Sequence, residues 1–242
     1  MRRIVFIALA LCMVQMVFAQ DSPAVKTSVP ATNVYVGGND HLLLQLGYAQ
    51  WSGKPDSIHT KGFSRTFNIY FMFAFPFKTN PHLSVALGPG IATDHIFFDE
   101  MDVRIADPVP TLVFRDLSDT NHYKKFKVAT AYIEAPVEFR YSSNPYDDKH
   151  SVKVAVGAKV GALMSAWVKG KDLEGDNGNP VRSSIAKEKS KRFFNSYRLS
   201  VAGRLGYGKF SLFSSYAINA LFKEGVGPSV HPFTIGLTIS GL

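Results

Sequence analysis

The segment YIEAPVEFRY, residues 132–141, alternates between two unlike sets of side chains with a period of two residues. Its odd-numbered side chains are apolar or aromatic. Its even-numbered side chains include two carboxylates, a guanidinium and a proline. Period-two alternation predicts a β-strand whose two faces lie in different surroundings. The fold depends on which face points inward.

The same alternation recurs to the end of the chain and is clearest in PFTIGLTISGL, residues 232–242. No segment of comparable length has the period of an amphipathic helix. The pattern predicts eight strands, at Leu42–Trp51, Arg65–Pro76, His82–Thr93, Thr130–Tyr141, Ser151–Val168, Asn195–Tyr207, Phe210–Phe222 and Pro232–Leu242.

The connections between these strands alternate strictly between short and long. The expected long connections are Ser52–Ser64, Asp94–Ala129, Lys169–Phe194 and Lys223–His231. Short turns at one rim and long loops at the other are typical of bacterial outer-membrane barrels. The sequence therefore predicts an all-β, eight-stranded antiparallel up-and-down transmembrane β-barrel with short periplasmic turns and long extracellular loops.

A soluble lipocalin-like barrel has the same alternation, but it places the apolar face inside. The polar face here carries glycine and other small residues, as at Gly88, Gly90, Gly157 and Gly161. Glycine weakens a solvent-facing strand, whereas the narrow lumen of an eight-stranded barrel needs small side chains. We therefore expect the polar face to point inward and the apolar face to contact lipid.

Aromatic residues near the strand ends agree with two membrane interfaces, where outer-membrane barrels carry aromatic girdles. The expected turn-end girdle is Phe75, Phe77, Tyr141, Tyr207 and Phe210. The expected loop-end girdle is Trp51, Phe97, Phe98, Trp167, Phe193, Phe194, Phe222 and Phe233.

The N-terminus has the pattern of a secretory signal peptide, with a basic start, an apolar run and a small-residue cleavage site ending at Ala19. We expect residues 1–19 to be this signal, 20–40 a periplasmic lead-in and 41–242 the barrel. The single cysteine, Cys12, lies in the signal, so the mature chain has no disulfide and no thiol ligand.

Charged residues on the inward face of several strands predict a paired network in the lumen, because an unpaired buried charge is costly. The expected members are Glu134, Glu138, Arg140, Lys153, Lys159, Arg198 and Arg204. A turn centred near Pro145–Tyr146 would place Glu138 opposite Lys153, and Glu134 opposite Gly157 within reach of Arg204. We also expect Pro136 to mark a bulge or break, since it has no ladder donor.

The strand Tyr132-Ile133-Glu134-Ala135-Pro136 resembles a mid-chain motif of the outer-membrane β-barrel family of Bacteroidetes-type bacteria, often called PorT-like. The resemblance covers most of the chain in its predicted architecture, but only this short motif in its amino-acid sequence. It implies the barrel fold and a place in the outer membrane, and it implies no activity.

Without Arg2 and Arg3 the chain has 25 basic and 19 acidic residues, a net charge of +6. An exported chain rarely meets nucleic acid, so anionic lipid or lipopolysaccharide phosphate is the expected partner. The loop from Lys169 to Phe194 carries the basic residues placed to contact it, and a simply solvated loop stays an open alternative. These residues are Lys187, Lys189, Lys191 and Arg192.

Motifs for chemistry are weak. A barrel deacylase would need serine, histidine and an acid on the outer wall. No His-x-Ser pair occurs on a lipid-facing strand segment. The acid-rich loop from Asp94 to Asp119 matches no calcium-loop spacing. We expect no catalytic residue, no metal and no cofactor.

These observations favour a non-enzymatic outer-membrane barrel with a closed, charge-paired lumen. It would act as a structural, accessory or loop-mediated binding protein of the envelope, and an envelope protein complex is a further candidate partner. A narrow passive channel and a lipid A-modifying barrel enzyme are the alternatives.

Overall fold

The computed structural model describes residues 41–175 and 179–241, apart from the side chain at position 148. The expected signal peptide (1–19) and lead-in (20–40) lie outside the described residues. The described part is all-β, with one short 3₁₀ turn at Asp148–His150. The strands are β1 (Leu42–Ser52), β2 (Arg65–Phe71), β3 (Phe73–Phe77), β4 (Asn80–Leu87), β5 (Gly90–Phe98), β6 (Met101–Val103), β7 (Phe114–Asp116), β8 (His122–Ser142), β9 (Val152–Glu174), β10 (Pro180–Lys189), β11 (Tyr197–Tyr207), β12 (Phe210–Ala217) and β13 (His231–Ser240).

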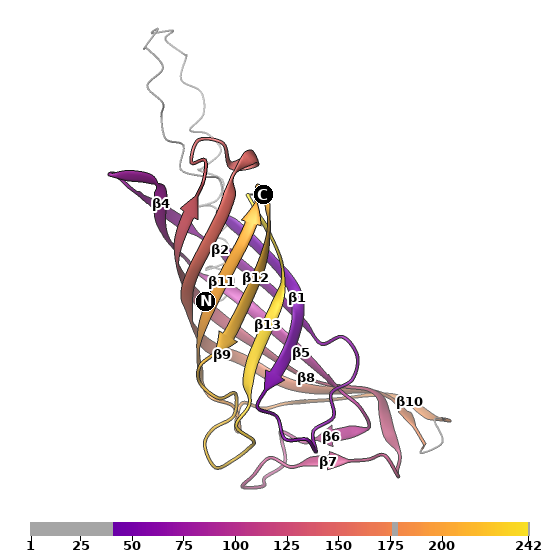
Figure 1. Cartoon of the computed structure of the whole chain (residues 1–242). Helices are drawn as coiled ribbons and strands as arrows, with labels where there is room; N and C mark the ends of the chain where they lie inside the picture. Colours follow the sequence, from indigo (N-terminus) through magenta and orange to yellow (C-terminus); the bar gives the residue numbers. More distant parts are fainter. Residues whose placement is uncertain (1–40, 176–178, 242) are drawn as a thin grey trace, which may run out of the picture. The chain divides into compact units, whose positions relative to one another are not determined.

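Eight of these strands pair in a ring, in the order β1, β2, β5, β8, β9, β11, β12 and β13 (Figure 1). The ring is complete because β13 pairs with β1 and β8 pairs with β9, and every pairing is antiparallel. The predicted all-β, eight-stranded up-and-down architecture is confirmed. Among the described residues, no helix has the length and apolarity to cross a membrane.

Two of the predicted strands are interrupted near the turn end. The second divides at Met72 into β2 and β3, and the third divides after Leu87 into β4 and β5. Pro136 lies beside this second break, and its carbonyl accepts a hydrogen bond from the Gly88 amide at 3.4 Å. The expected irregularity is therefore in the neighbouring strand. The register shift between β8 and β9 lies at Ala131 and Tyr132 instead, and its extra residue is Met164 of β9.

The outer face of the ring is apolar, as the alternation predicts. Ile133 and Val137 on β8, and Val156 and Val160 on β9, expose 50–58% of their surface. The intervening side chains are buried and mostly small or polar. Close strand approach explains the inward glycines, because a Cβ on Gly157 would collide with the backbone of β8.

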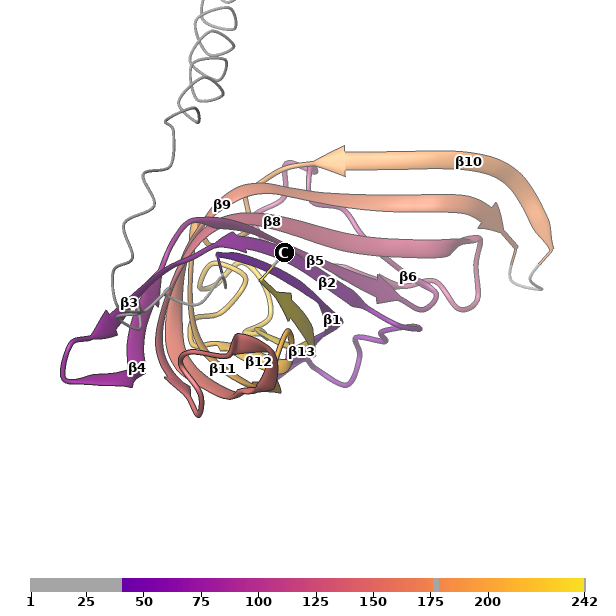
Figure 2. The same ribbon diagram turned by 90° about the horizontal axis from the view of Figure 1, so that it is seen from above.

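The loop end is more structured than the sequence predicts. β8 and β9 both run well past their expected ends, and β10 forms in the region expected to be a long loop. These three strands continue beyond the ring as a sheet (Figure 2). A separate hairpin of β6 and β7 forms in the other expected loop. The period-two patterns of β8 and β9 are hidden here because the outward face carries lysines in place of apolar side chains.

Aromatic side chains at the loop end pack into a buried core. The Trp51 ring lies 5.4 Å from the Phe98 ring and 5.5 Å from the Phe222 ring, measured between centroids. We call this core the loop-end cap; its members include Trp51, Ile58, Phe98, Ile105, Phe126, Val128, Val168, Phe193, Phe194, Phe222 and Val230.

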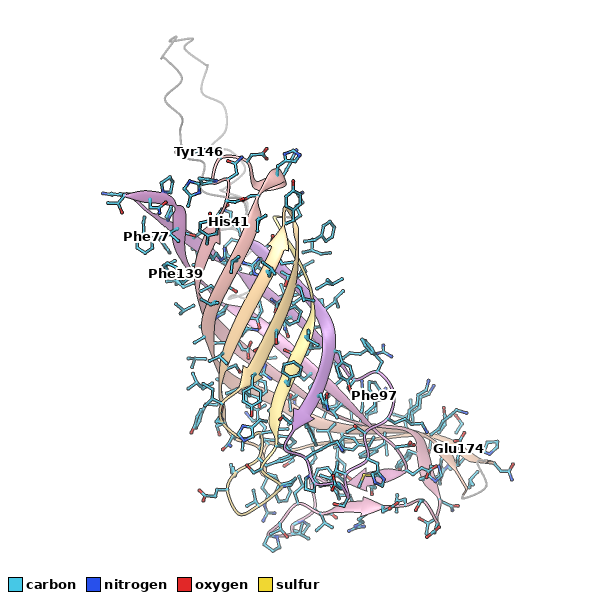
Figure 3. The ribbon with its side chains drawn as sticks, in the orientation of Figure 1. His41, Phe77, Phe97, Phe139, Tyr146 and Glu174 are labelled. Carbon is cyan, nitrogen blue, oxygen red and sulfur yellow. The ribbon has the colours of Figure 1, made fainter. Side chains whose placement is uncertain are left out.

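The predicted loop-end girdle is therefore wrong for Trp51, Phe98, Phe193, Phe194 and Phe222, which are 1–3% exposed inside the cap. Burial against the other loops stabilises these rings more than contact with headgroups would. Phe97, Trp167 and Phe233 remain half-buried on the outer surface. The turn-end girdle is exposed as expected, and Figure 3 shows Phe77 at that end and Phe97 at the other.

Candidate functional site

Arg198 is the centre of the charges inside the ring. Its Nε and Nη2 atoms donate to Glu134 Oε1 at 2.9 and 2.6 Å, and its Nη1 donates to Asp94 Oδ2. The guanidinium carbon also lies 4.1 Å from the centroid of the Tyr132 ring. The four residues come from β11, β8 and β5, so the contacts cross the lumen from one wall to another.

Tyr70 and Lys159 extend this cluster. The Tyr70 hydroxyl donates to Glu134 Oε2 at 2.6 Å, and Lys159 Nζ donates to the Tyr70 oxygen at 3.3 Å. The Lys159 ammonium also lies 5.1 Å from the Tyr70 ring centroid. Each of the three side chains is nearly or fully buried. Such burial is tolerable because each charge meets an opposite charge, a hydroxyl or an aromatic face.

A second cluster lies nearer the turn end. Arg140 Nε donates to Glu138 Oε2 at 2.8 Å, and Arg204 Nη2 donates to the same oxygen at 3.1 Å. All three residues are 7% exposed. One carboxylate thus meets two guanidinium groups. Across both clusters the described buried charges are three carboxylates, including Asp94, and four cations.

The register of β8 against β9 differs from the predicted one. Glu138 lies opposite Gly157 and Glu134 lies opposite Gly161, four residues further along β9 than expected. The turn is centred near Asp147 because Asp147 caps the 3₁₀ turn and accepts a hydrogen bond from the Lys149 amide. A shift of two residues in the turn centre moves every cross-strand partner by four.

This register changes the partners of four predicted residues. Glu134 binds Arg198 rather than Arg204, and Arg204 binds Glu138. Lys153 is half-buried opposite Ser142, so the predicted pairing across the strands with Glu138 is wrong.

Gly161 makes room for the Glu134 carboxylate. A Cβ at position 161 would lie 2.9 Å from Glu134 Cγ and 3.2 Å from its Oε1. Real Cβ atoms do not approach other heavy atoms so closely, so any larger side chain would displace the carboxylate from Arg198. The small residue thus positions the acid without touching the cation.

Neutral polar side chains fill the other side of the lumen. Asn68 Nδ2 donates to Gln45 Oε1 at 3.2 Å, and Gln45 Nε2 donates to Thr238 Oγ1 at 3.1 Å. A cavity of about 10 Å³ lies beside Arg198 and Lys159, which is about the volume that one water molecule needs.

The sequence missed Asp94 and Tyr70 as members of the lumen. Asp94 continues the inward face of Gly90 and Ala92, and extending the predicted third strand by one residue would have included it. Tyr70 lies between the outward-facing Ile69 and Phe71, so the alternation of the strand predicts that its side chain points inward.

The four residues predicted to contact lipopolysaccharide divide into two pairs. Lys187 and Lys189 are exposed on β10, and the Lys187 ammonium lies 5.8 Å from the Trp167 ring centroid. Lys191 and Arg192 follow β10 and donate to the backbone carbonyls of Leu163 and Asp107, at 3.4 and 3.5 Å. The second pair therefore contacts the protein itself.

Other lysines share the face of β8, β9 and β10 that carries Lys187 and Lys189. Lys127 lies opposite Lys169, and Lys169 lies opposite Lys187. We call this surface the basic sheet face; it carries Lys125, Lys127, Lys169, Lys171, Lys187 and Lys189. Sequence reasoning placed only the last two here, because the extensions of β8 and β9 were expected to be loop.

The acid-rich segment is not a single site. Asp94 points into the lumen, whereas Asp99 forms an ion pair in the loops, with its Oδ1 2.8 Å from Lys61 Nζ. This contact with Asp99 raises the pKa of the Lys61 ammonium above its ordinary value. Within residues 41–175 and 179–241, no three metal-ligating side chains gather at one point.

The described geometry agrees with the family model that matches the sequence. Residues 18–226 match the model of the outer membrane protein beta-barrel domain. No curated protein matches the sequence.

Two solved structures of Ail, the attachment invasion locus protein of Yersinia pestis, are 16% identical to the chain, with TM-scores of 0.35 and 0.34. Both alignments cover 82% of this chain, and 95% and 96% of the Ail chains. One of these structures is a complex with the heparin analogue sucrose octasulfate.

A mutant porin of Rh. blastica is 8% identical, with a TM-score of 0.14, over 82% of this chain and 97% of the porin. These identities and scores are low, so the assignment of the chain to a family rests on the match to residues 18–226.

Proposed function

The chain belongs to the outer membrane protein beta-barrel domain family and lies in the bacterial outer membrane, and from this premise we propose a non-enzymatic barrel with a closed, charge-paired lumen. In this proposal the protein is a structural, accessory or binding component of the envelope, and its loop end carries the binding surface. We infer further that it is PorT-like, from the motif at residues 132–136.

The observation that carries the proposal is the ion-pair cluster around Arg198. Glu134 and Asp94 reach the same guanidinium from different strands, which fills the cross-section of the ring with side chains. An eight-stranded ring leaves an interior about wide enough for side chains alone. The water-sized cavity beside Arg198 supports the same interpretation.

The loop-end cap supports a binding role over a transport role. Its buried rings cover the loop end of the lumen with a packed apolar core, next to the folded hairpin of β6 and β7. A folded platform presents its surface residues with little loss of conformational entropy on binding. The partner we propose is outer-membrane lipid, with an envelope protein complex as a second candidate.

The lipopolysaccharide contact predicted from the sequence is part of this proposal. Lys187 and Lys189 are exposed on β10 and available to phosphate groups. Lys191 and Arg192 also donate to backbone carbonyls, so we assign them mainly to holding the loops together.

Single-channel conductance tests the closed lumen. We expect the purified barrel in planar bilayers to give no stepwise conductance, under conditions where a general porin conducts. Regular steps would contradict a closed lumen and favour the narrow channel. Since the buried charges include one more cation than carboxylate, such a channel would prefer anions.

A deletion strain tests the absence of enzymatic activity on lipid A. We expect the mass spectrum of lipid A to be unchanged when the protein is absent. A mass shift equal to one acyl chain, restored by the wild-type protein, would contradict the proposal.

A further inference from the structure

The basic sheet face concentrates charge of one sign. Phe97, Lys127, Lys169 and Lys187 occupy one continuous cross-strand row on β5, β8, β9 and β10. Like charges directly opposite each other destabilise a sheet. A row of three lysines on adjacent strands would therefore be stabilised by an anion, since the only described polar partner of the row is the His95 ring, 3.3 Å from Lys127 Nζ.

The protein supplies few carboxylates to this face. Among the described residues, Lys171 alone of the six lysines has a carboxylate within ion-pair distance, that of Asp172 at 3.6 Å. Glu188 and Asp102 line a cavity on the opposite face of the same sheet. An anion that compensates the row would therefore come from outside the described residues.

Aromatic rings lie between the cations. Arg65 and Lys127 each lie 5.6 Å from the centroid of the Phe97 ring, and Lys187 lies over Trp167. The Trp167 ring also lies 5.9 Å from the His95 ring. Aromatic rings beside cations are typical of the membrane–water interface, where one side is apolar and the other is wet.

The row lies at the height of the lipid headgroups. From Val154 to Met164 the outward face of β9 is apolar, a span of about 34 Å along the strand, or about 24 Å along the barrel axis at a tilt of about 45°. This is about the height of the apolar band of an outer-membrane barrel. Lys169 follows Met164 by five residues and so lies just beyond that band.

The basic sheet face is turned toward the membrane side. It continues the lipid-facing outer wall of the ring, because cross-strand partners share a face along β8 and β9. The other face carries Phe126, Val128 and Val168, which are buried in the loop-end cap. In Figure 1, β6 and β7 lie beyond the β8–β10 sheet, on the side away from the barrel.

We propose that the row Lys127, Lys169 and Lys187, with Arg65 at its edge, binds the phosphate groups of glycolipid in the outer leaflet. The extended sheet thus lies over the membrane surface and binds it through its lysines. The assignment rests on the proposed lipid partner and is independent of whether the lumen is closed.

Native mass spectrometry of the detergent-purified protein tests the assignment. The probes are bis-phosphorylated lipid A and the same lipid A with both phosphates removed. We expect the wild type to retain the phosphorylated form and to release the dephosphorylated form. The variant with Lys127→Gln, Lys169→Gln and Lys187→Gln should bind the phosphorylated lipid about tenfold or more weakly.

A matched control removes three lysines from the short turns at the opposite end, with Lys78→Gln, Lys149→Gln and Lys209→Gln. It should bind within about twofold of the wild type, since these lysines lie far from the row and exposed charges are screened over about a Debye length. Arginine at the three row positions should preserve binding. If the triple variant does not fold, the single variant Lys169→Gln tests the assignment, and we expect it to bind phosphorylated lipid A about threefold more weakly.

Two results would overturn the assignment. One is equal retention of phosphorylated lipid A by the wild type and the row variant. The other is displacement of lipid A by millimolar inorganic phosphate, which would identify a site for free anions. Neither result bears on the closed lumen, which the conductance measurement tests separately. The two proposals can therefore be contradicted independently.

Discussion

The lumen and the basic sheet face are two groups of charges that the chain treats in opposite ways. In the lumen, Arg198 meets Glu134 and Asp94 inside the protein, and all three are nearly excluded from solvent. On the sheet face, Lys169 is half-buried between two other lysines, and no carboxylate of the described residues lies within ion-pair distance of it. The same β8 and β9 carry both groups, the lumen charges within the membrane-spanning part and the basic sheet face beyond its loop end.

This difference shows how the position of a charge decides its role. A charge inside a narrow ring must be paired by the protein, because desolvation without a partner costs several kcal/mol. A charge at the headgroup level can be left for lipid to pair. The lumen charges therefore govern stability, whereas those of the basic sheet face govern binding.

The largest expected effect comes from removing the central cation of the lumen. Arg198→Met leaves Glu134 and Asp94 buried without their partner, and we expect a loss of about 3–5 kcal/mol in the free energy of unfolding. Urea titration of the barrel in lipid vesicles, followed by tryptophan fluorescence, measures it.

A matched variant separates charge from packing. Arg198→Met combined with Glu134→Gln and Asp94→Asn removes all three charges at nearly constant volume. It should recover most of the lost stability, because replacing buried ion partners together is often nearly neutral, and Lys159 keeps its contacts with Tyr70. An equal loss in both variants would mean that shape, not charge, stabilises the lumen.

The next effect tests how tightly the lumen is packed. Gly161→Ala places a Cβ against the Glu134 side chain, so we expect a loss of about 1–3 kcal/mol from overpacking. Gly203→Ala is the control, since its Cβ would find its nearest neighbour at 3.9 Å. The same urea titration compares the two, and equal stabilities would show that the lumen has room to spare.

Removing a charge from the basic sheet face should raise the stability of the protein, whereas removing a lumen charge lowers it. In zwitterionic vesicles, Lys169→Gln removes the repulsion from Lys127 and Lys187, and we expect a gain of a few tenths of a kcal/mol. The gain should disappear at high salt, which screens exposed charges. A loss of stability at low salt would show that Lys169 has a stabilising partner within the protein.

The smallest effect is expected at the β8–β9 turn. His150 donates to Asp147 at 2.7 Å, and this hydrogen bond lowers the pKa of the Asp147 carboxyl. Its contribution to stability is present above the ordinary pKa of aspartate and is lost as the pH falls through the lowered pKa. The stability difference between the wild type and Asp147→Asn should therefore shrink on acidification, and a difference independent of pH would contradict this account.

The ring could be predicted from the sequence because its strands have unlike faces. In β8 the alternation of Glu134 and Glu138 with Ile133 and Val137 indicates the strand and its orientation at once. The extensions of β8 and β9 were missed since they carry lysines on one face and the cap on the other. The cap itself depends on contacts between loops far apart in sequence, which no local pattern encodes.

The lumen residues were partly within reach of sequence reasoning. Parity identifies which side chains of a strand share a face, so the inward position of Glu134 follows from the pattern. Its partner does not, because the register depends on the centre of a turn fixed by Asp147. The turn centre lies two residues beyond its predicted position. For this reason the observed partner of Glu134 is Arg198 and not the predicted Arg204.

The most direct test of the contrast is native mass spectrometry of three proteins extracted gently from their own outer membrane. These are the wild type, the variant with three charges removed around Arg198, and the variant with glutamine at Lys127, Lys169 and Lys187. We predict bound phosphorylated glycolipid on the first two and its loss from the third. Equal lipid on all three, or loss of lipid from the lumen variant alone, would contradict the separation of the two groups of charges.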